Sequence, residues 1–168
     1  MKNHLFLIGF MGAGKTSVGL TLAAELDLPY VDLDQKIVAL AGKSIPEIFH
    51  EEGEAVFRDL ESSTLFDLSG SPPSVVATGG GIIGRSENRA FMSDHGTVFY
   101  LFAQWETLKQ RIGATAGRPL AQADHDWRAT RELLSARSQW YEQADYIIVT
   151  DHRTVADIVT EIRSHAKL

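Results

Sequence analysis

The sequence contains no cysteine among its 168 residues. A disulfide framework, a thiolate zinc site and a thiol nucleophile are therefore excluded. An excess of positive charge is also lacking, since 22 acidic residues outnumber 16 Lys and Arg residues and give a formal net charge of −6. A nucleic-acid partner is not expected, because such binding leaves a basic face on the protein.

Long hydrophobic runs are missing too. No apolar stretch approaches the roughly 20 residues that a membrane-spanning helix needs, and the short apolar segment near the N-terminus runs into a glycine-rich loop instead of a cleavage site. The 6 histidines are scattered and make no metal-ligand pair at helical spacing. With 44% hydrophobic residues, the chain is expected to be one cytoplasmic domain with a sizeable core and no membrane partner.

What is present is a glycine-rich phosphate loop. Residues 9–16, GFMGAGKT, match G-x-x-x-x-G-K-[ST] at every fixed position. A buried-strand pattern over 5–8 precedes the loop and a helical pattern follows it, which is the context of a nucleotide-binding loop rather than of a chance turn. Backbone N–H groups at such a helix start bind phosphate, so we predict a nucleoside triphosphate site. Lys15 would reach the β- and γ-phosphates, and the Thr16 hydroxyl would coordinate Mg²⁺.

The remaining patterns alternate between strands and helices. Further near-continuous apolar strands are expected at 28–34, 74–78, 97–102 and 146–150. Helices are expected between them, at about 35–41, from 44, 54–68, 86–95, 105–112 and 127–142, with a last one from 154. This alternation predicts an α/β fold, a three-layer arrangement with a five-stranded parallel sheet flanked by helices.

Two acidic residues end the second expected strand. In an extended chain Tyr30, Asp32 and Asp34 share one face. Two carboxylates at the carboxyl end of a parallel strand would project into the crevice where such sheets bind ligands. The alternatives are that Asp34 caps the helix over 35–41 and that Asp32 is a solvated strand end.

Helix-start signals are clearer elsewhere in the chain. Ser44 with Glu47, and Thr154 with Asp157, have the spacing of a capping box. Ser86 is expected to cap the helix that runs to about residue 95.

Three glycines follow the third expected strand, Gly79, Gly80 and Gly81. Their backbone N–H groups could meet an anionic or hydroxylated substrate, and a plain turn is the alternative. Many phosphate-loop ATPases place an acid at the end of this strand, but none stands here. The acidic partner of Mg²⁺ must then come from elsewhere, with Asp32 as the nearer candidate and Asp151 as the weaker one.

Arginines supply candidate charge for ligands. Arg58 and Glu61 lie three apart on the helix 54–68 and could pair, so a surface salt bridge is one interpretation of Arg58. The segment 113–124 is rich in small residues and has the length of a lid. Within it Arg118 could close onto the γ-phosphate as an arginine finger, or be a solvated loop arginine.

In combination these residues resemble the shikimate kinases, small phosphate-loop kinases of the nucleoside-monophosphate-kinase fold type. The resemblance covers essentially the whole chain. It rests on the phosphate loop, the acidic pair in 31–34, G-E-x-x-F-R-x-x-E over 53–61, T-G-G-G over 78–81, G-R-P-L over 117–120, and L-x-x-R-x-x-x-Y-x-x-A-D over 134–145. The triple glycine without an acid after the third strand is the most specific feature.

The resemblance implies transfer of the ATP γ-phosphoryl to the 3-hydroxyl of shikimate, in the pathway to chorismate and the aromatic amino acids. It implies an enzyme that acts on small molecules with Mg²⁺, and a monomer is expected. The cytoplasmic location expected from the composition agrees with such an enzyme. The substrate-binding subdomain would span about 33–61 and the lid about 113–124.

The resemblance also implies roles for individual residues. The implied catalytic residues are Lys15, Asp34 and Arg118. The implied ATP-binding residues are Gly12, Ala13, Gly14, Lys15, Thr16, Ser17, Arg111, Arg118 and Arg153. The implied shikimate-binding residues are Asp34, Arg58, Gly79, Gly80, Gly81 and Arg137, and the implied metal-binding residues are Thr16 and Asp32.

One position departs from the family. A proline often packs against adenine after the last strand, whereas 151–155 is DHRTV here. Val155 or Arg153 is expected to take over that contact. The competing functions are a related kinase acting on gluconate or a nucleoside monophosphate, and a catalytically silent nucleotide-sensing module.

Overall fold

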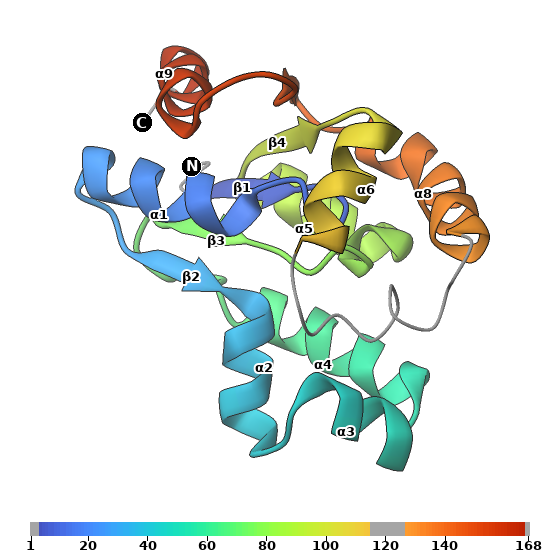
Figure 1. Ribbon diagram of the computed structural model, residues 1–168. Helices are drawn as coiled ribbons and strands as arrows, with labels where there is room; N and C mark the ends of the chain where they lie inside the picture. Colours follow the sequence, from blue (N-terminus) through green and yellow to red (C-terminus); the bar gives the residue numbers. More distant parts are fainter. Residues whose placement is uncertain (1–3, 115–126, 167–168) are drawn as a thin grey trace.

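A parallel sheet forms the centre of the molecule (Figure 1). The computed structural model describes residues 4–114 and 127–166. Within them the strands are β1 (His4–Ile8), β2 (Tyr30–Asp32), β3 (Val75–Ala77), β4 (Gly96–Phe102) and β5 (Tyr146–Val149), in the order β2-β3-β1-β4-β5. Every neighbouring pair is parallel. The predicted α/β fold with a five-stranded parallel sheet is confirmed for these residues.

Helices flank this sheet. They are α1 (Lys15–Leu26), α2 (Leu33–Ala41), α3 (Ile45–Glu51), α4 (Glu54–Phe66), the 3₁₀ turn η1 (Ile82–Gly84), α5 (Ser86–His95), α6 (Trp105–Gly113), α8 (Arg128–Tyr141) and α9 (Val155–His165). Helices α1 and α9 pack against each other, and α5 packs against β4. In the described part of the chain, no helix is both long and apolar enough to cross a membrane.

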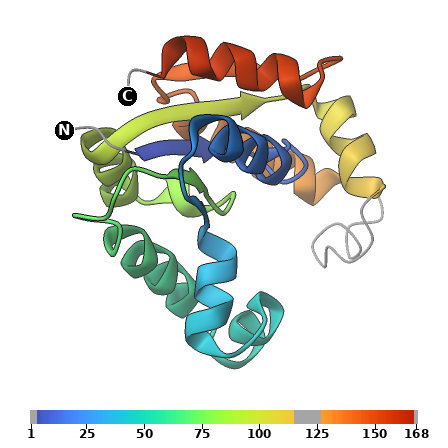
Figure 2. The same cartoon turned by 90° about the vertical axis from the view of Figure 1, so that its left-hand side faces the viewer.

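Two hydrophobic clusters lie in different parts of the fold. The larger one surrounds the sheet, whose central strand β1 is buried at every residue. The smaller one joins Ile37, Ile48 and Phe57 from α2, α3 and α4. Figures 1 and 2 show these three helices as a group beneath the sheet. This group therefore has a small core of its own, separate from the core around the sheet.

The start of α2 corrects the prediction for the acidic pair. The second strand ends at Asp32, and Asp34 lies in the first turn of α2 instead of extending the strand. Asp32 is the N-cap, because its side chain accepts a hydrogen bond of 3.1 Å from the Gln35 N–H. The alternative that Asp34 is the cap is therefore wrong. Capping suits Asp32, whose short carboxylate reaches an N–H left open at a helix start.

Of the other predicted helix caps, two are confirmed and one is wrong. Both predicted capping boxes are confirmed, at Ser44 with Glu47 and at Thr154 with Asp157. The prediction that Ser86 caps α5 is wrong by one position. Ser86 is the first residue of α5, and the cap residue Arg85 makes no side-chain capping bond.

Buried His4 predicts a pH dependence of stability. Its ring contacts the Ser74 hydroxyl at 2.8 Å and the Leu68 carbonyl at 3.3 Å, and burial lowers its pKa below the ordinary value of 6.5. The unfolded chain then takes up this proton first as the pH falls. The stabilising contribution is complete above about pH 6.5 and is lost as the pH falls toward the folded pKa. Urea unfolding at a series of pH values measures it.

The comparison variants for this prediction are His4→Asn and His152→Asn. His4→Asn should flatten the fall in unfolding free energy below pH 6.5. His152 is exposed and has a positive φ of 56°, which asparagine tolerates, so His152→Asn should keep the wild-type dependence. An unchanged pH profile in His4→Asn would contradict the prediction.

Candidate active site

A cavity of about 600 Å³ opens at the carboxyl ends of β1, β2 and β3. In parallel sheets the loops at this edge converge, so residues far apart in sequence meet there. Most of the predicted site residues line it: Gly12, Gly14, Lys15, Thr16, Ser17, Asp32, Asp34, Arg58, Gly79, Gly80, Gly81, Arg111 and Arg137. The phosphate loop and the triple glycine thus share one cavity.

The phosphate loop forms the wall after β1. Gly12 and Gly14 have φ values of 80° and 97°, a region that residues with a Cβ rarely adopt. Gly14 is the N-cap of α1, so Lys15 begins the helix. The Lys15 ammonium donates hydrogen bonds to the carbonyls of Gly9 at 2.7 Å and Phe10 at 3.0 Å. The loop is therefore shaped as a nest whose lysine lies over it.

Ala13 differs from the other predicted ATP-binding residues of this loop. Its side chain is packed in the main core, and its N–H donates to the Phe10 carbonyl at 3.1 Å. Its contact with ATP stays a prediction.

The Asp32 carboxylate makes two contacts, one with the start of α2 and one with Tyr30. While one carboxylate oxygen caps α2, the other accepts a bond of 3.4 Å from the Tyr30 hydroxyl. Burial, and next the charge of Asp32, raise the pKa of Tyr30. The tyrosine ring fits here because Gly19 on α1 has no side chain, and a Cβ there would lie 2.6 Å from the ring. Asp32 is thus held at the wall of the cavity that Thr16 also lines.

Gly79 brings two carboxylates together. A Cβ at Gly79 would lie 2.7 Å from a Glu61 oxygen and 2.8 Å from an Asp34 oxygen. Glu61 is only 2% exposed. Burial raises its pKa, the Arg58 guanidinium opposes that rise, and Asp34 adds to it. Only a glycine lets the chain pass this close to both acids.

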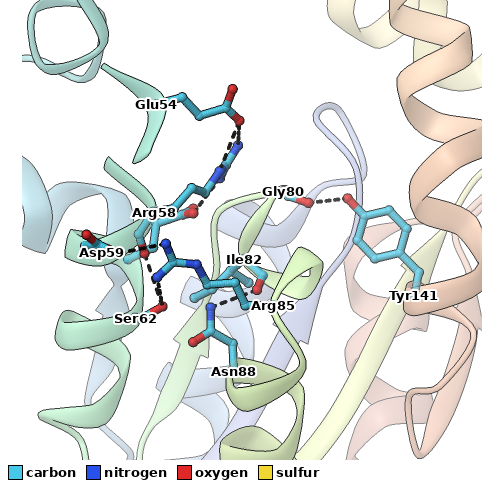
Figure 3. Close-up of polar contacts among 10 residues, drawn as sticks. Glu54, Arg58, Asp59, Ser62, Gly80, Ile82, Arg85, Asn88 and Tyr141 are labelled. Carbon is cyan, nitrogen blue, oxygen red and sulfur yellow. Dashed lines mark hydrogen bonds and ion pairs between the residues drawn. The ribbon is translucent and has the colours of Figure 1, made fainter. Parts of the chain in front are cut away.

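Arg58 lies on the other side of the same glycine run. Its guanidinium donates to Glu61 at 2.5 Å. It also donates to Glu54 at 3.2 Å (Figure 3). A Cβ at Gly81 would lie 2.3 Å from the guanidinium. The predicted pairing of Arg58 with Glu61 is confirmed, but it is a half-buried pair at the cavity and not a surface salt bridge.

Arg137 approaches the glycine run from α8. Its guanidinium carbon lies 5.9 Å from the centre of the Phe10 ring. A Cβ at Gly80 would be 3.5 Å from its Nη1 atom. Two arginines from helices far apart in the sequence, α4 and α8, therefore flank three consecutive glycines, which leaves the glycine backbone accessible between two positive charges.

Two of the predicted arginines differ in their relation to the cavity, since Arg111 lines it and Arg153 does not. Arg111 donates to the Gly12 carbonyl at 3.3 Å and to Thr150, which joins the phosphate loop to the end of β5. Arg153 is paired with Glu161 and donates to the Asp157 carbonyl of α9. Arg118 and nearly all of the predicted lid lie outside the described residues.

Asp151, the weaker metal candidate, has a structural role. Its carboxylate accepts from the Gln104 N–H at 3.1 Å and from the Thr107 hydroxyl at 2.5 Å. It therefore fastens the start of α6 to the end of β5, whereas Asp32 lines the cavity.

Comparison with known proteins gives the chain its family. The family model described as "Shikimate kinase" matches residues 11–167. A shikimate kinase from Ralstonia nicotianae is 42% identical over 95% of this chain and 85% of its own length. One from Persephonella marina is 41% identical over 96% of this chain and 97% of its own length.

This chain belongs to the shikimate kinase family. The fold agrees with that of a solved family member. A shikimate kinase from Acinetobacter baumannii, solved in complex with shikimate, superposes with a TM-score of 0.91 at 37% identity and covers 97% of this chain and 92% of its own. The resemblance of the sequence to this family is thus confirmed over nearly its full length.

Within the family site, two residues were given no site role from the sequence. Glu61 was considered only as a partner for Arg58, yet it is buried beside Asp34. Tyr141 entered only as a position of the motif over 134–145, yet its hydroxyl donates to the Gly80 carbonyl at 2.5 Å. The spacing of Arg137 and Tyr141, one helical turn apart, is the only signal in the sequence that could have indicated a shared target.

Proposed function

We propose that this chain transfers the γ-phosphoryl group of ATP to the 3-hydroxyl of shikimate, giving shikimate 3-phosphate and ADP. The observation that carries the proposal is that one cavity holds a phosphate loop at one wall and, at another, a glycine run flanked by two arginines and a carboxylate. Such an arrangement suits a small acceptor that carries both an anionic group and a hydroxyl. Family membership supports the same reaction.

At the acceptor end, Arg58 and Arg137 bind the shikimate carboxylate, a group that the guanidinium fork matches. Gly79, Gly80 and Gly81 offer backbone contacts between them. Asp34 holds the hydroxyl groups and accepts the proton of the 3-hydroxyl as its oxygen attacks the γ-phosphorus. The bond from that phosphorus to the bridging oxygen breaks, and ADP leaves with the electron pair.

At the donor end, the N–H groups of 12–17 and the Lys15 ammonium bind the phosphates. Thr16 and Asp32 offer hard oxygen ligands of the kind that Mg²⁺ takes in kinases, so the donor set at the cavity wall fits this ion. Thr16 would bind it directly and Asp32 through water. When bound, Mg²⁺ neutralises charge on the transferred phosphoryl group.

Further parts of the proposal concern positions around the cavity. Arg118 would neutralise the γ-phosphate as the segment 113–124 closes, and Arg111, with Arg153 or Val155, would contact the adenine. The segment 33–61 would act as the substrate-binding subdomain, which its separate small core supports. We expect a monomer that works in the cytoplasm, where ATP is supplied.

The test is an assay coupled to ADP release, with ATP and Mg²⁺ and with shikimate, gluconate or AMP as acceptor. Turnover with shikimate alone is the expected result. Turnover with another acceptor would replace the substrate and keep the phosphate site. ATP binding without turnover on any acceptor would favour a sensing module.

Removing the negative charge of Asp32 should weaken the binding of Mg²⁺. Asp32→Asn keeps a good N-cap for α2 but removes the negative charge, so the Mg²⁺ concentration for half-maximal activity should rise about tenfold. The melting temperature should stay near that of the wild type. Asp157→Asn, which changes a capping-box residue of α9, is the matched control and should leave the Mg²⁺ requirement unchanged.

Gly81→Ala, which adds a methyl group to the glycine run, should weaken shikimate binding. The new Cβ would overlap the Arg58 guanidinium, where the contact would be 2.3 Å. Because that group ends a flexible side chain, the fold should survive while the arginine moves. KM for shikimate should rise about 10- to 100-fold, and KM for ATP should change little. Steady-state kinetics with each substrate varied in turn measures both.

The control for this prediction is Gly84→Ala in the same segment. A Cβ there would meet its nearest atom, on Trp140, at an ordinary 3.9 Å. It should leave both KM values unchanged. An equal rise of KM for shikimate in both variants would contradict the account based on Arg58.

A further inference from the structure

Tyr141 is a fully buried tyrosine at the end of α8. Its ring stacks on Tyr100 of β4 with centres 5.0 Å apart and planes inclined by 14°. Its hydroxyl donates to the Gly80 carbonyl at 2.5 Å (Figure 3). A buried side chain stacked on Tyr100 therefore brings its hydroxyl to the glycine run.

This contact controls the direction of a neighbouring N–H group. In a trans peptide the C=O and the following N–H point in opposite directions across one rigid plane. Because the Gly80 carbonyl points to Tyr141, the Gly81 N–H of the same peptide must point away from Tyr141. Gly80 and Gly81 both line the cavity. This hydrogen bond thus orients the Gly80–Gly81 peptide, to which the proposed function assigns a backbone contact with shikimate.

The same helix also carries Arg137, one turn before Tyr141. A Cβ at Gly80 would lie 3.5 Å from the Arg137 guanidinium and 3.6 Å from the Tyr141 hydroxyl. Both residues therefore approach Gly80 from one face of α8, which fixes the distance between the arginine and the peptide.

The segment after the glycines is fastened at two more points. Asn88 donates to the Ile82 carbonyl at 2.9 Å, and Arg85 bonds to Asp59 and Ser62 of α4 (Figure 3). The contact of Asn88 holds the segment to α5, and the contacts of Arg85 hold it to α4. Among these side-chain contacts of Asn88, Arg85 and Tyr141, the hydrogen bond from Tyr141 is the one that reaches a glycine of the run.

We propose that Tyr141 is a positioning residue for shikimate, whose hydroxyl orients the Gly80–Gly81 peptide before the substrate arrives. This inference rests on the proposed function for the identity of the ligand. Burial raises the pKa of Tyr141, while Arg137 opposes that rise. The hydroxyl therefore remains a donor across the neutral pH range and can hold a carbonyl.

The variant Tyr141→Phe removes the hydroxyl and keeps the stacked ring. KM for shikimate should rise about tenfold, the size of effect expected for one lost hydrogen bond that orients a binding group. KM for ATP should stay within twofold, because the phosphate loop is not touched. The matched control is Tyr100→Phe, which removes a hydroxyl from the same stacked pair but leaves the bond from Tyr141 to Gly80 in place.

A rise of less than threefold in KM for shikimate would overturn the proposal. So would an equal rise in KM for ATP, or an equal effect in Tyr100→Phe, since either would indicate a general packing defect. A rise confined to shikimate and to Tyr141→Phe supports it.

A second measurement needs neither a variant nor a substrate. Amide ¹⁵N relaxation of the wild-type protein without ligands should give Gly80 and Gly81 order parameters near those of rigid backbone, about 0.85. Values below about 0.6 would show a peptide that is not oriented in advance and would overturn the proposal. This result does not depend on the acceptor, so failure of the proposed function and failure of the proposed positioning are separate outcomes.

Discussion

Asp34→Asn should lower kcat about 10²- to 10⁴-fold, the range over which a positioned general base contributes. Asparagine has the same shape as aspartate and can still accept a hydrogen bond, but it cannot take the proton of the attacking hydroxyl. KM for shikimate should change much less than kcat. Stopped assays at high enzyme concentration, with shikimate and ATP both saturating, measure the loss.

The fold should tolerate this change. Asp34 lies close to Glu61 around Gly79, so removing one of two neighbouring negative charges reduces repulsion. The melting temperature should therefore equal or exceed that of the wild type. Asp94→Asn, the same substitution at an exposed acid on α5, is the control and should keep full activity. A kcat for Asp34→Asn within tenfold of the wild type would remove Asp34 from the role of base.

Arg58→Met should have two separable effects. Loss of a charged hydrogen-bond donor to the substrate carboxylate should raise KM for shikimate about 100-fold. Loss of the partner of Glu61, which is 2% exposed, should also lower the free energy of unfolding by about 3 kcal/mol, as expected when one member of a buried pair is removed. Steady-state kinetics and urea unfolding measure the two effects.

The pH dependence of the second effect has a definite sign. Burial raises the pKa of Glu61 and Arg58 opposes this, so the pKa rises further in Arg58→Met. A carboxyl whose folded pKa is above the unfolded value stabilises the fold at low pH, and this is lost as the pH rises through the folded pKa. The stability deficit of Arg58→Met should therefore be small at pH 5 and larger at pH 8.

A second substitution separates stability from binding. In Arg58→Met/Glu61→Gln the buried charge is gone, so most of the lost stability should return, while KM for shikimate stays high. Recovery of both quantities together would mean that Arg58 acts only as a structural partner of Glu61. Recovery of neither would place the defect outside this pair.

The sequence was sufficient for several contacts whose deciding interaction is local. The phosphate loop is a contiguous motif between a strand and a helix, and its glycines adopt the positive φ values that the motif requires. The partners of the capping box, Ser44 and Glu47, are three positions apart, and so are Arg58 and Glu61 on one helix. Spacing along the chain fixes such contacts, because helix geometry turns it directly into distance.

The conformation of the acidic pair, Asp32 and Asp34, could not be predicted from the sequence alone. Alternation alone put Asp32 and Asp34 on one strand face. In the fold, the register of β2 with β3 ends at Asp32 and Ala77, and the chain turns into α2 immediately afterwards. Where a strand ends depends on how far its neighbour extends, which no local pattern contains.

The contacts around the glycine run depended on tertiary structure entirely. The sequence indicated that Gly79, Gly80 and Gly81 would meet a ligand. Only the packed chain brings Asp34 and Glu61 against Gly79, Arg58 against Gly81, and the Tyr141 hydroxyl to the Gly80 carbonyl. These partners come from α2, α4 and α8, up to 61 residues away in sequence. The sequence by itself therefore determined the family, the fold and the phosphate-loop motif. Packing between distant elements decided which acid is the cap and which groups surround the glycine run, because those distances are set by the sheet order and not by spacing along the chain.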